Sequence, residues 1–191
     1  MKVHFSASIT GQDKYSKHYQ KIVDTLKELG VEILSDHVIS EKKEDVLTKS
    51  KNETIAFYKK QNDWINKSDI VIIEASFRST ALGHELSIAL KKNKPLIILY
   101  VKGKKTKIFD GLAANSDKVQ LVSYDLDNLK QTLKHAIDYA QDQQDTRFNF
   151  FISPKHQSYL DWIAKNRKIP RSVYLRNLIE KNMAENEKYQ G

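Results

Sequence analysis

The apolar residues of this 191-residue chain recur in two alternating patterns. Short runs of continuous or alternating apolar residues are typical of strands and lie at residues 2–7, 31–34, 70–73, 96–101 and 119–122. The runs at 70–73 and 96–99 contain no polar residue, which indicates parallel strands covered on both faces. Amphipathic helices are predicted between these two runs and at residues 14–29, 55–65 and 126–140.

Strands that alternate with helices predict an α/β protein with a five-stranded doubly wound parallel sheet, of the flavodoxin-like or Rossmann-like kind. The segment 141–146 has no apolar residue, so we interpret it as a linker between a first domain, 1–140, and a second, 147–191. The second domain begins with alternating residues typical of a strand, and helices are predicted after Pro154 and Pro170. Its few core positions indicate that it does not fold alone.

The composition limits the classes of protein. There is no cysteine, which excludes a disulfide framework, a thiolate nucleophile and a cysteine-ligated zinc. The first residues lack the apolar core of a signal peptide, and no run of roughly 18 apolar residues is present. We therefore expect a cytoplasmic protein that does not bind membranes.

The net charge of +8 is distributed unevenly along the chain. The segment from residue 147 onward contains nine Lys and Arg and four Asp and Glu, a net charge of +5. The rest of the chain therefore has a net charge of +3. A basic segment attracts nucleic acid or acidic partners, or is simply a solvated face.

Candidate site residues follow the run at 70–73, at the start of the next predicted helix. They are Ser79, Thr80, Gly83, His84 and Glu85. In open α/β sheets, ligands bind outside the carboxyl ends of the strands. The loop after the first strand faces the same crevice and contributes Ser6, Ser8, Ile9 and Gly11. A glycine at position 11 permits close approach of the backbone.

Residues 1–125 resemble the nucleoside 2-deoxyribosyltransferase and 2'-deoxynucleoside 5'-phosphate N-hydrolase family, in the motifs HFSASITG, LSDH, DWINKSDIVIIEAS and STALGHEL. The resemblance implies that Glu85 attacks the anomeric carbon of deoxyribose and expels the base, and that water or another base resolves the glycosyl-enzyme, as in a retaining glycosidase. Glu85 lies in the opening turn of the predicted helix, where the amide ends favour a carboxylate. The alternative is that it only complements the helix dipole.

The resemblance also implies roles for two further residues. Ser79 matches the serine that holds the 5'-phosphate in the hydrolases, with help from helix-opening amides, or it is only an N-cap. The transferases have an aspartate there, so the serine favours a nucleotide over a nucleoside. His37 matches a histidine near the base; the alternative is a solvent-facing loop histidine.

The chain departs from the family at positions that matter for catalysis. Gln61 stands where the family has an aspartate that binds sugar and assists proton transfer to the leaving base. Glutamine cannot act as a general acid or base, a contribution of about 10² to 10⁴ in rate. Asp63 lies roughly 200° further round the helix and cannot replace it. The arginine that many hydrolases place after the first-strand glycine is also missing, since Gln12, Asp13 and Lys14 stand there.

No metal-ligand cluster, P-loop or dinucleotide-binding glycine motif occurs, so no metal or cofactor is expected. The leading hypothesis is a nucleotide- or nucleoside-binding protein that cleaves the N-glycosidic bond of a nucleoside 5'-monophosphate. The alternative is a DNA-binding regulator whose degenerate pocket senses a nucleotide.

Residues 147–183 resemble the ribbon-helix-helix family, in which two chains pair their strands and interlock four helices. This implies an obligate homodimer, or a higher homo-oligomer in which neighbours complete each site. In DNA-binding members the outward strand residues enter the major groove, here Arg147, Asn149 and Phe151, and Arg171 and Ser172 would meet phosphate. An aromatic at the third strand position is unusual for base reading, so Phe151 contacts a thymine methyl or packs against protein. The unit then either binds DNA or only dimerises the chain.

Overall fold

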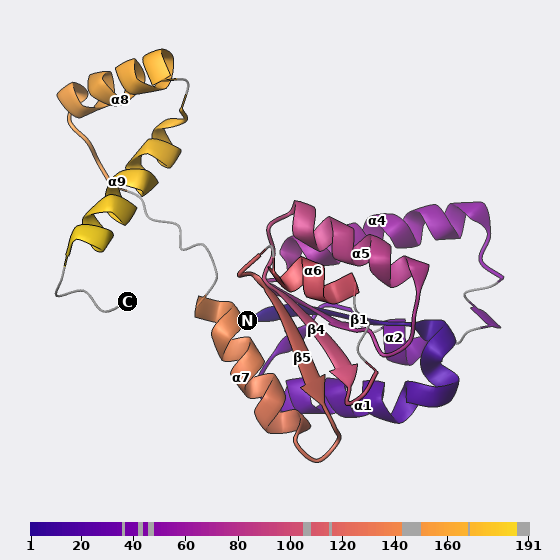
Figure 1. Cartoon of the computed structure of the whole chain (residues 1–191). Coiled ribbons are helices and arrows are strands. Elements are labelled where there is room, and N and C mark those ends of the chain that lie inside the picture. The colour runs from indigo at the N-terminus through magenta and orange to yellow at the C-terminus, as the bar shows by residue number, and fades with distance from the viewer. Residues whose placement is uncertain are drawn as a thin grey trace. The chain divides into compact units, whose positions relative to one another are not determined.

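The computed structural model describes residues 1–35, 37–41, 44–45, 48–104, 108–114, 116–142, 150–167 and 169–186. The chain divides into two compact units, residues 1–145 and 146–191 (Figure 1). Each unit is described by itself below. None of the described helices is both long enough and apolar enough to cross a bilayer.

The first unit contains a five-stranded sheet in the order β2-β1-β3-β4-β5. All neighbouring strands are parallel, which confirms the predicted α/β sheet. The strands are β1 (Lys2–Ala7), β2 (Glu32–Ile33), β3 (Ile70–Glu74), β4 (Leu96–Val101) and β5 (Val119–Tyr124).

The edge strand β2 has two residues, whereas the pattern at 31–34 predicted four. Leu34 still donates its backbone N to Val3 O at 2.9 Å, and beyond it the pairing with β1 is made by a side chain. The hydroxyl of Ser35 donates to Phe5 O at 2.7 Å and accepts from Phe5 N at 3.0 Å.

Helices cover both faces of the sheet. They are α1 (Gln12–Glu28), α2 (His37–Ser40), α4 (Lys51–Lys67), α5 (Thr80–Lys91), α6 (Ile108–Ala114) and α7 (Leu129–Asp142), and a 3-10 turn, η1 (Ile9–Gly11), precedes α1. Figure 1 shows α1 and α7 on one side of the sheet and α4, α5 and α6 on the other. Helix α7 ends two residues inside the predicted linker.

The alternation of side chains along β1 separates the core from the candidate site. Val3 and Phe5 pack in the core formed with α1 and α7. Successive strand residues point to opposite faces, so His4 and Ser6 lie on the side of α4 and α5. Both are fully buried, which is unusual for polar residues without partners.

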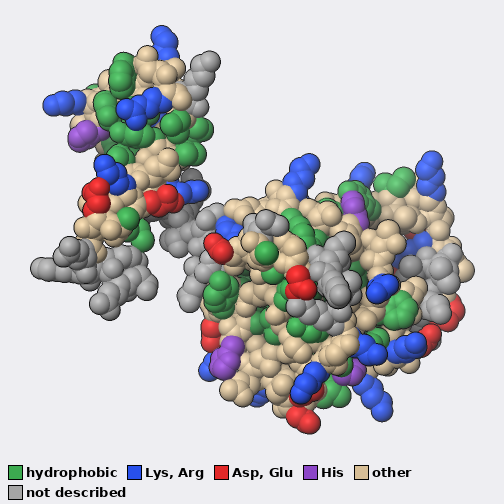
Figure 2. Space-filling view, in the orientation of Figure 1, with side chains coloured by type: hydrophobic (Ala, Val, Ile, Leu, Met, Phe, Trp, Pro, Cys, Tyr) green, Lys and Arg blue, Asp and Glu red, His purple; other side chains and the backbone are tan. Residues whose placement is uncertain are grey.

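The second unit contains α8 (Pro154–Arg167) and α9 (Arg171–Glu185). Its described part buries only Leu160 and Ile163 among the large apolar residues. Figure 2 shows hydrophobic side chains on the visible surface of this unit. The exposed large apolar side chains of its described residues are Phe150, Phe151, Ile152, Tyr159, Trp162, Val173, Leu178, Ile179 and Met183.

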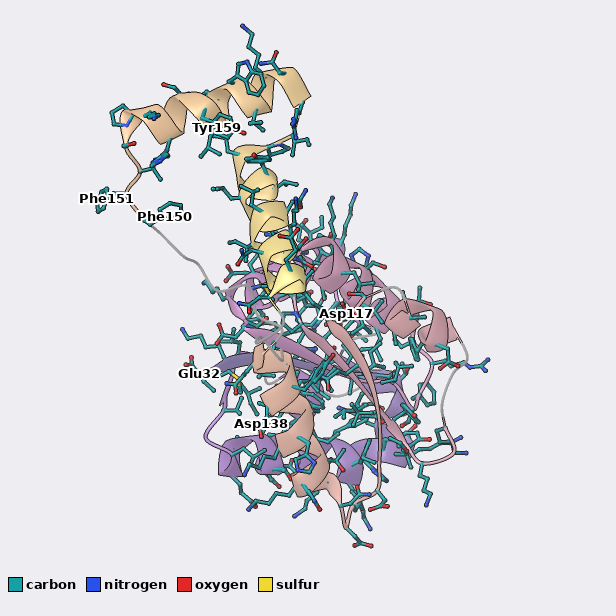
Figure 3. All side chains as sticks on the ribbon, turned by 60° about the vertical axis from the view of Figure 1, so that its left-hand side comes forward. Glu32, Asp117, Asp138, Phe150, Phe151 and Tyr159 are labelled. Atoms are coloured by element: carbon teal, nitrogen blue, oxygen red, sulfur yellow. The ribbon has the colours of Figure 1, made fainter. Side chains whose placement is uncertain are left out.

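The strand predicted at the start of this unit is not observed in its described part. Residues 150–152 are in neither a helix nor a strand, and Arg147 and Asn149 lie outside the described residues. Figure 3 shows Phe151 projecting from the chain before α8. The ribbon-helix-helix arrangement therefore stays a prediction.

Candidate active site

Glu85 is the centre of a buried polar cluster on the α4 and α5 side of the sheet. Its side chain is 3% exposed, and its Oε2 lies 2.8 Å from His4 Nε2. Its Oε1 accepts hydrogen bonds from Ser6 Oγ at 2.9 Å and from Gln61 Nε2 at 3.1 Å. An ionised carboxylate only accepts hydrogen bonds, so this geometry fits a carboxylate facing three donors, with the His4 proton on Nε2.

The position of Glu85 in its helix differs from the prediction. Helix α5 begins at Thr80, so Glu85 is its sixth residue and belongs to the second turn, not the opening turn. The helix dipole acts mainly within the first turn. The side-chain donors from β1 and α4 therefore do more to hold this carboxylate than the helix amides do.

Aromatic side chains border the cluster. His37 on α2 and Trp64 on α4 stack at 5.4 Å with an interplanar angle of 11°. Phe57 meets His37 edge-on at 5.3 Å, and the His4 ring lies 6.1 Å from Trp64. His37 is buried, which excludes the solvent-facing alternative and places it near the partners of Glu85.

Sequence reasoning missed His4, Phe57 and Trp64. His4 interrupts an apolar run in β1, and a buried histidine among apolar neighbours was a signal that could have been used. Phe57 and Trp64 were counted only as the apolar side of α4. The wide aromatic face of that helix was the available signal.

Ser79 occupies the N-cap position of α5, but its side chain makes no capping hydrogen bond. Ser79 therefore has the N-cap position that the alternative predicted, without the side-chain hydrogen bond of a typical cap, and its phosphate-binding role stays a prediction. Ser79 and Gly83 line a cavity of about 550 Å³ whose other walls are mainly apolar, including Phe77, Leu82, Leu86, Phe109 and Leu112.

The remaining predicted residues do not contact Glu85 through the interactions that the structure records. Ser8 Oγ pairs with Thr10 Oγ1 at 2.9 Å. The exposed His84 stacks on Tyr58 of α4 at 5.3 Å. Ile9 belongs to the 3-10 turn.

The structure gives a packing reason for glycine at position 11. A Cβ on Gly11 would lie 2.7 Å from Tyr19 OH and 2.8 Å from Phe77 Cβ. Side-chain packing inside the protein therefore favours glycine here, and the close approach of a ligand to this loop stays a prediction.

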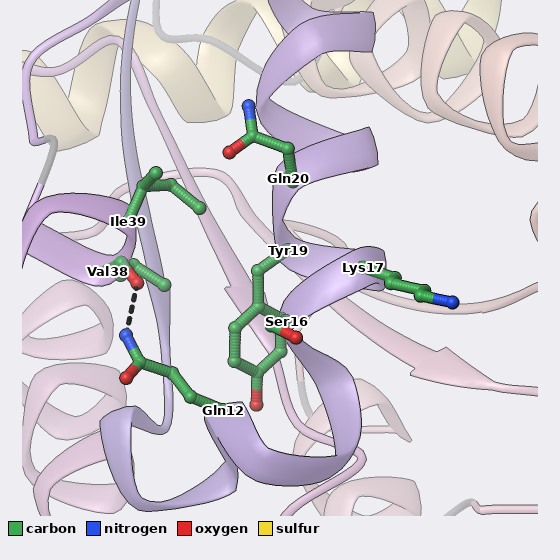
Figure 4. A pocket seen from close by; sticks show the side chains of 7 residues that line it. All are labelled: Gln12, Ser16, Lys17, Tyr19, Gln20, Val38 and Ile39. Atoms are coloured by element: carbon green, nitrogen blue, oxygen red, sulfur yellow. Dashed lines mark hydrogen bonds between the residues drawn. The ribbon is translucent and has the colours of Figure 1, made fainter. Parts of the chain in front are cut away.

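Many hydrolases have an arginine close to the position of Gln12. In this chain Gln12 links two helices, and Figure 4 shows its hydrogen bond to Val38. Its Nε2 donates to Val38 O at 2.8 Å and to Glu41 O at 2.9 Å. These bonds tie α1 to α2, which carries His37. A cavity of about 420 Å³ lies beside this link, lined by Gln12, Ser16, Lys17, Tyr19, Gln20, Val38 and Ile39.

The described residues include no group of three or more His, Asp or Glu side chains placed to hold a metal ion. The site instead consists of a carboxylate, its donors and an aromatic wall at the carboxyl edge of the sheet. Fold and site together define an α/β protein with a buried acidic group at the position where such folds bind ligands.

Comparison with known proteins identifies the family. No protein-family model matches the chain. A Syntrophotalea carbinolica protein assigned as 2'-deoxynucleoside 5'-phosphate N-hydrolase 1 is 30% identical over 138 residues, covering 72% of this chain and 94% of that protein. A Danio rerio 5-hydroxymethyl-dUMP N-hydrolase is 31% identical over 104 residues, covering 52% of this chain and 68% of the relative. The chain therefore belongs to the 2'-deoxynucleoside 5'-phosphate N-hydrolase family.

A solved structure agrees with this assignment at the level of the fold. The CMP N-glycosidase BcmB of Clostridium botulinum superposes with a TM-score of 0.52 at 19% identity. The match covers 71% of this chain and 99% of the bacterial enzyme.

Proposed function

We propose that the first unit cleaves the N-glycosidic bond of a nucleoside 5'-monophosphate, with Glu85 as the nucleophile. The observation that carries this proposal is the buried Glu85 carboxylate, held by donors from β1 and α4. Membership of the N-hydrolase family supports the reaction class, since the relatives are named for hydrolysis of deoxynucleoside 5'-phosphates.

In the first step, the Glu85 carboxylate attacks C1' of the sugar. The C1'–N bond breaks, its electron pair leaves with the base, and a glycosyl ester forms on Glu85. Water then attacks C1', which releases the sugar phosphate and restores the carboxylate. His4 and Ser6 keep the carboxylate in one orientation throughout, so that no reorganisation is needed during attack.

The presence of Gln61 at the family's aspartate position lowers the expected rate of base release. Its amide hydrogen-bonds Glu85 but cannot protonate the leaving base, so that proton must come from water. Losing a general acid costs about 10² to 10⁴ in rate. We therefore expect tight recognition of the nucleotide and slow release of the base.

Two other groups of residues would bind the substrate. The stacked rings of His37 and Trp64 offer a flat face for the nucleobase. Ser79 would donate its hydroxyl to the 5'-phosphate together with the first amides of α5, an arrangement that favours anions.

The test is release of free base from every ribo- and deoxyribonucleoside 5'-monophosphate, followed by chromatography. We expect at least one substrate to be cleaved, and we expect Glu85→Gln to abolish cleavage. Glu32→Gln, a matched change of an exposed glutamate on β2, serves as the control. If no nucleotide yields free base, or Glu85→Gln retains the full rate, the proposal is wrong.

For the second unit we propose a dimerisation role. Among its described residues, the exposed large apolar side chains outnumber the buried ones, and a unit of this size needs a partner to bury them. Removal of residues 146–191 should reduce the mass in solution to that of a monomer. An unchanged mass would contradict this role.

The second candidate function of this unit is DNA binding, for which the described residues give mixed support. Ser172 is exposed, whereas Arg171 pairs with Asp161 inside the unit. Gel shifts over a salt series, with and without nucleotide, test the regulator hypothesis, because phosphate contacts weaken steeply with salt. Negligible affinity for every duplex at low salt would exclude it.

A further inference from the structure

A second buried glutamate lies at the end of β3, on the opposite side of the sheet from Glu85. Glu74 follows Ile72, which packs in the core formed with α1 and α7, and residues two apart along a strand share a face. The Glu74 side chain is fully buried. Nothing in the reaction proposed above uses it.

Glu74 holds the chain that follows β3. Its Oε1 accepts hydrogen bonds from the backbone N of Ser76 at 3.3 Å and from the Ser76 hydroxyl. Tyr124 at the end of β5 donates its hydroxyl to the same oxygen at 3.2 Å. The Ser76 hydroxyl in turn accepts from Val101 N at 2.8 Å, at the end of β4.

This network joins the carboxyl ends of three strands to one loop, residues 75–79. The loop leads directly into α5, which carries Ser79 at its N-cap and Glu85 one and a half turns later. We propose that Glu74 is a positioning residue that fixes loop 75–79 through Ser76 and thereby places Ser79 and Glu85 for catalysis. The catalytic part of this inference rests on the proposed function, but the effect on the loop does not.

The surroundings of Glu74 make the network sensitive to pH. Burial raises the pKa of Glu74 to about 7, although its hydrogen bonds from Ser76 and Tyr124 oppose the shift. The titratable groups that face it are Tyr124 from β5 and Tyr19 from α1, and Tyr15 of α1 lies beside Tyr19. His18 of α1 packs edge-on against Tyr124 at 5.7 Å.

Both forms of Glu74 are therefore populated near neutral pH. An ionised carboxylate accepts hydrogen bonds roughly twice as strong as those accepted by a neutral group. Local opening of loop 75–79 breaks the Ser76 hydrogen bonds, which lower the pKa of Glu74, while the carboxyl stays buried in the sheet. Ionisation therefore favours the closed loop, which should be held more firmly above pH 7 than below it, although global unfolding, which exposes the carboxyl, has the opposite pH dependence. A more rigid loop would increase the affinity of Ser79 for the 5'-phosphate of the substrate.

The test compares the full-length wild type with Glu74→Gln, Ser76→Ala and the control Glu32→Gln. Amide hydrogen exchange of residues 75–85 is measured from pH 5.5 to 8.5 and corrected for the intrinsic rate. In the wild type and in Glu32→Gln we expect protection to rise about tenfold through pH 7. In Glu74→Gln and Ser76→Ala this rise should be absent.

Steady-state kinetics with a cleavable nucleoside 5'-monophosphate provide the second measurement. Because Ser79 would hold the phosphate in both ground and transition states, we expect KM to rise more than kcat falls in Glu74→Gln. The second ionisation of the phosphate, near pH 6, affects all variants equally, so the difference between profiles isolates Glu74.

Wild-type exchange profiles in both Glu74→Gln and Ser76→Ala would overturn the inference. If Glu74→Gln does not fold, Ser76→Ala decides, because it breaks the link and leaves the carboxylate in place. If the wild type cleaves no nucleotide, the proposed function fails, and the exchange data still decide whether Glu74 controls the loop.

Discussion

At the residue scale, the contrast between Gln61 and Glu85 governs the expected chemistry. The Gln61 amide donates to Glu85 Oε1 at 3.1 Å, a place where a carboxyl group would carry a transferable proton. We predict that Gln61→Asp raises the rate of base release by about 100-fold, at the lower end of the usual contribution of a general acid. The measurement is single-turnover release of free base. Gln61→Asn is the control, and an equal gain there would contradict a role for the proton.

His4 is the donor that the sequence did not reveal. Its Nε2 lies 2.8 Å from Glu85 Oε2, and a hydrogen bond to a charged group contributes about 1.5 to 3 kcal/mol. We predict that His4→Phe, which keeps the ring and removes the donor, lowers kcat by about 10- to 100-fold. Exposed His135→Phe on α7 should leave kcat unchanged. A normal kcat for His4→Phe would show that Ser6 and Gln61 orient the carboxylate by themselves.

Gly11 is a steric constraint on the loop after β1. Its missing Cβ would approach Tyr19 OH and Phe77 Cβ to 2.7 and 2.8 Å, and overpacking of this kind costs about 1 to 3 kcal/mol. We predict that Gly11→Ala lowers the free energy of unfolding by that amount in urea denaturation. Gly111→Ala in α6, where a Cβ meets nothing within 4 Å, should be neutral or stabilising. Equal effects of the two changes would refute the steric explanation.

At the element scale, α4 matters most because it carries Gln61 and Trp64. Its N-terminus has a capping box, in which Ser50 N donates to Glu53 Oε2 at 2.8 Å and Ser50 Oγ accepts from Glu53 N at 3.4 Å. At the other end, Lys94 Nζ donates to Asn66 O at 2.9 Å and Ser68 O at 2.6 Å. Both ends of the helix are therefore held by side chains.

We predict that Ser50→Ala lowers Tm by about 2 to 4 °C, since removing an N-cap typically costs about 1 kcal/mol. Differential scanning calorimetry gives the measurement. Ser87→Ala on α5, where the serine hydroxyl only bonds back to Gly83 O, should leave Tm the same or slightly higher. An unchanged Tm for Ser50→Ala would mean that packing alone holds α4.

At the scale of the whole molecule, Glu74 makes stability depend on pH. Its ordinary pKa of 4.5 is raised by burial to about 7 in the folded protein, so between these values the folded state holds a proton that the unfolded chain has lost. The free energy of unfolding therefore falls as pH rises from about 4.5 to 7, by about 3 kcal/mol in total, and stays level above that.

This pH dependence is measured by urea unfolding of the full chain at pH 5 and pH 7.5. Other groups titrate too, so the comparison is between the wild type and Glu74→Gln. The wild type should lose more stability over this interval than the variant. Parallel curves would show that Glu74 does not titrate there.

The sheet of the first unit was predictable because continuous apolar runs such as those in β3 and β4 have one physical explanation, burial on both faces. The turns and the ends of the helices were less predictable from the sequence. Helix α7 begins at Leu129 instead of residue 126, because Asp125 and Asn128 bond to each other and close a turn first. Helices α2 and α6, of four and seven residues, are too short to show a helical period.

By itself the sequence determined the fold class, since strands and helices follow from local patterns along the chain, and its resemblance to a family singled out Glu85 as a candidate site residue. Only the tertiary structure showed what surrounds that carboxylate. His4, Ser6 and Gln61 come from 81, 79 and 24 residues away, and such distances in sequence carry no periodic signal. The structure also separated two buried glutamates, 11 positions apart, by placing them on opposite faces of one sheet. Glu85 is held by donors from β1 and α4, whereas Glu74 accepts hydrogen bonds from Ser76 in the loop between the two.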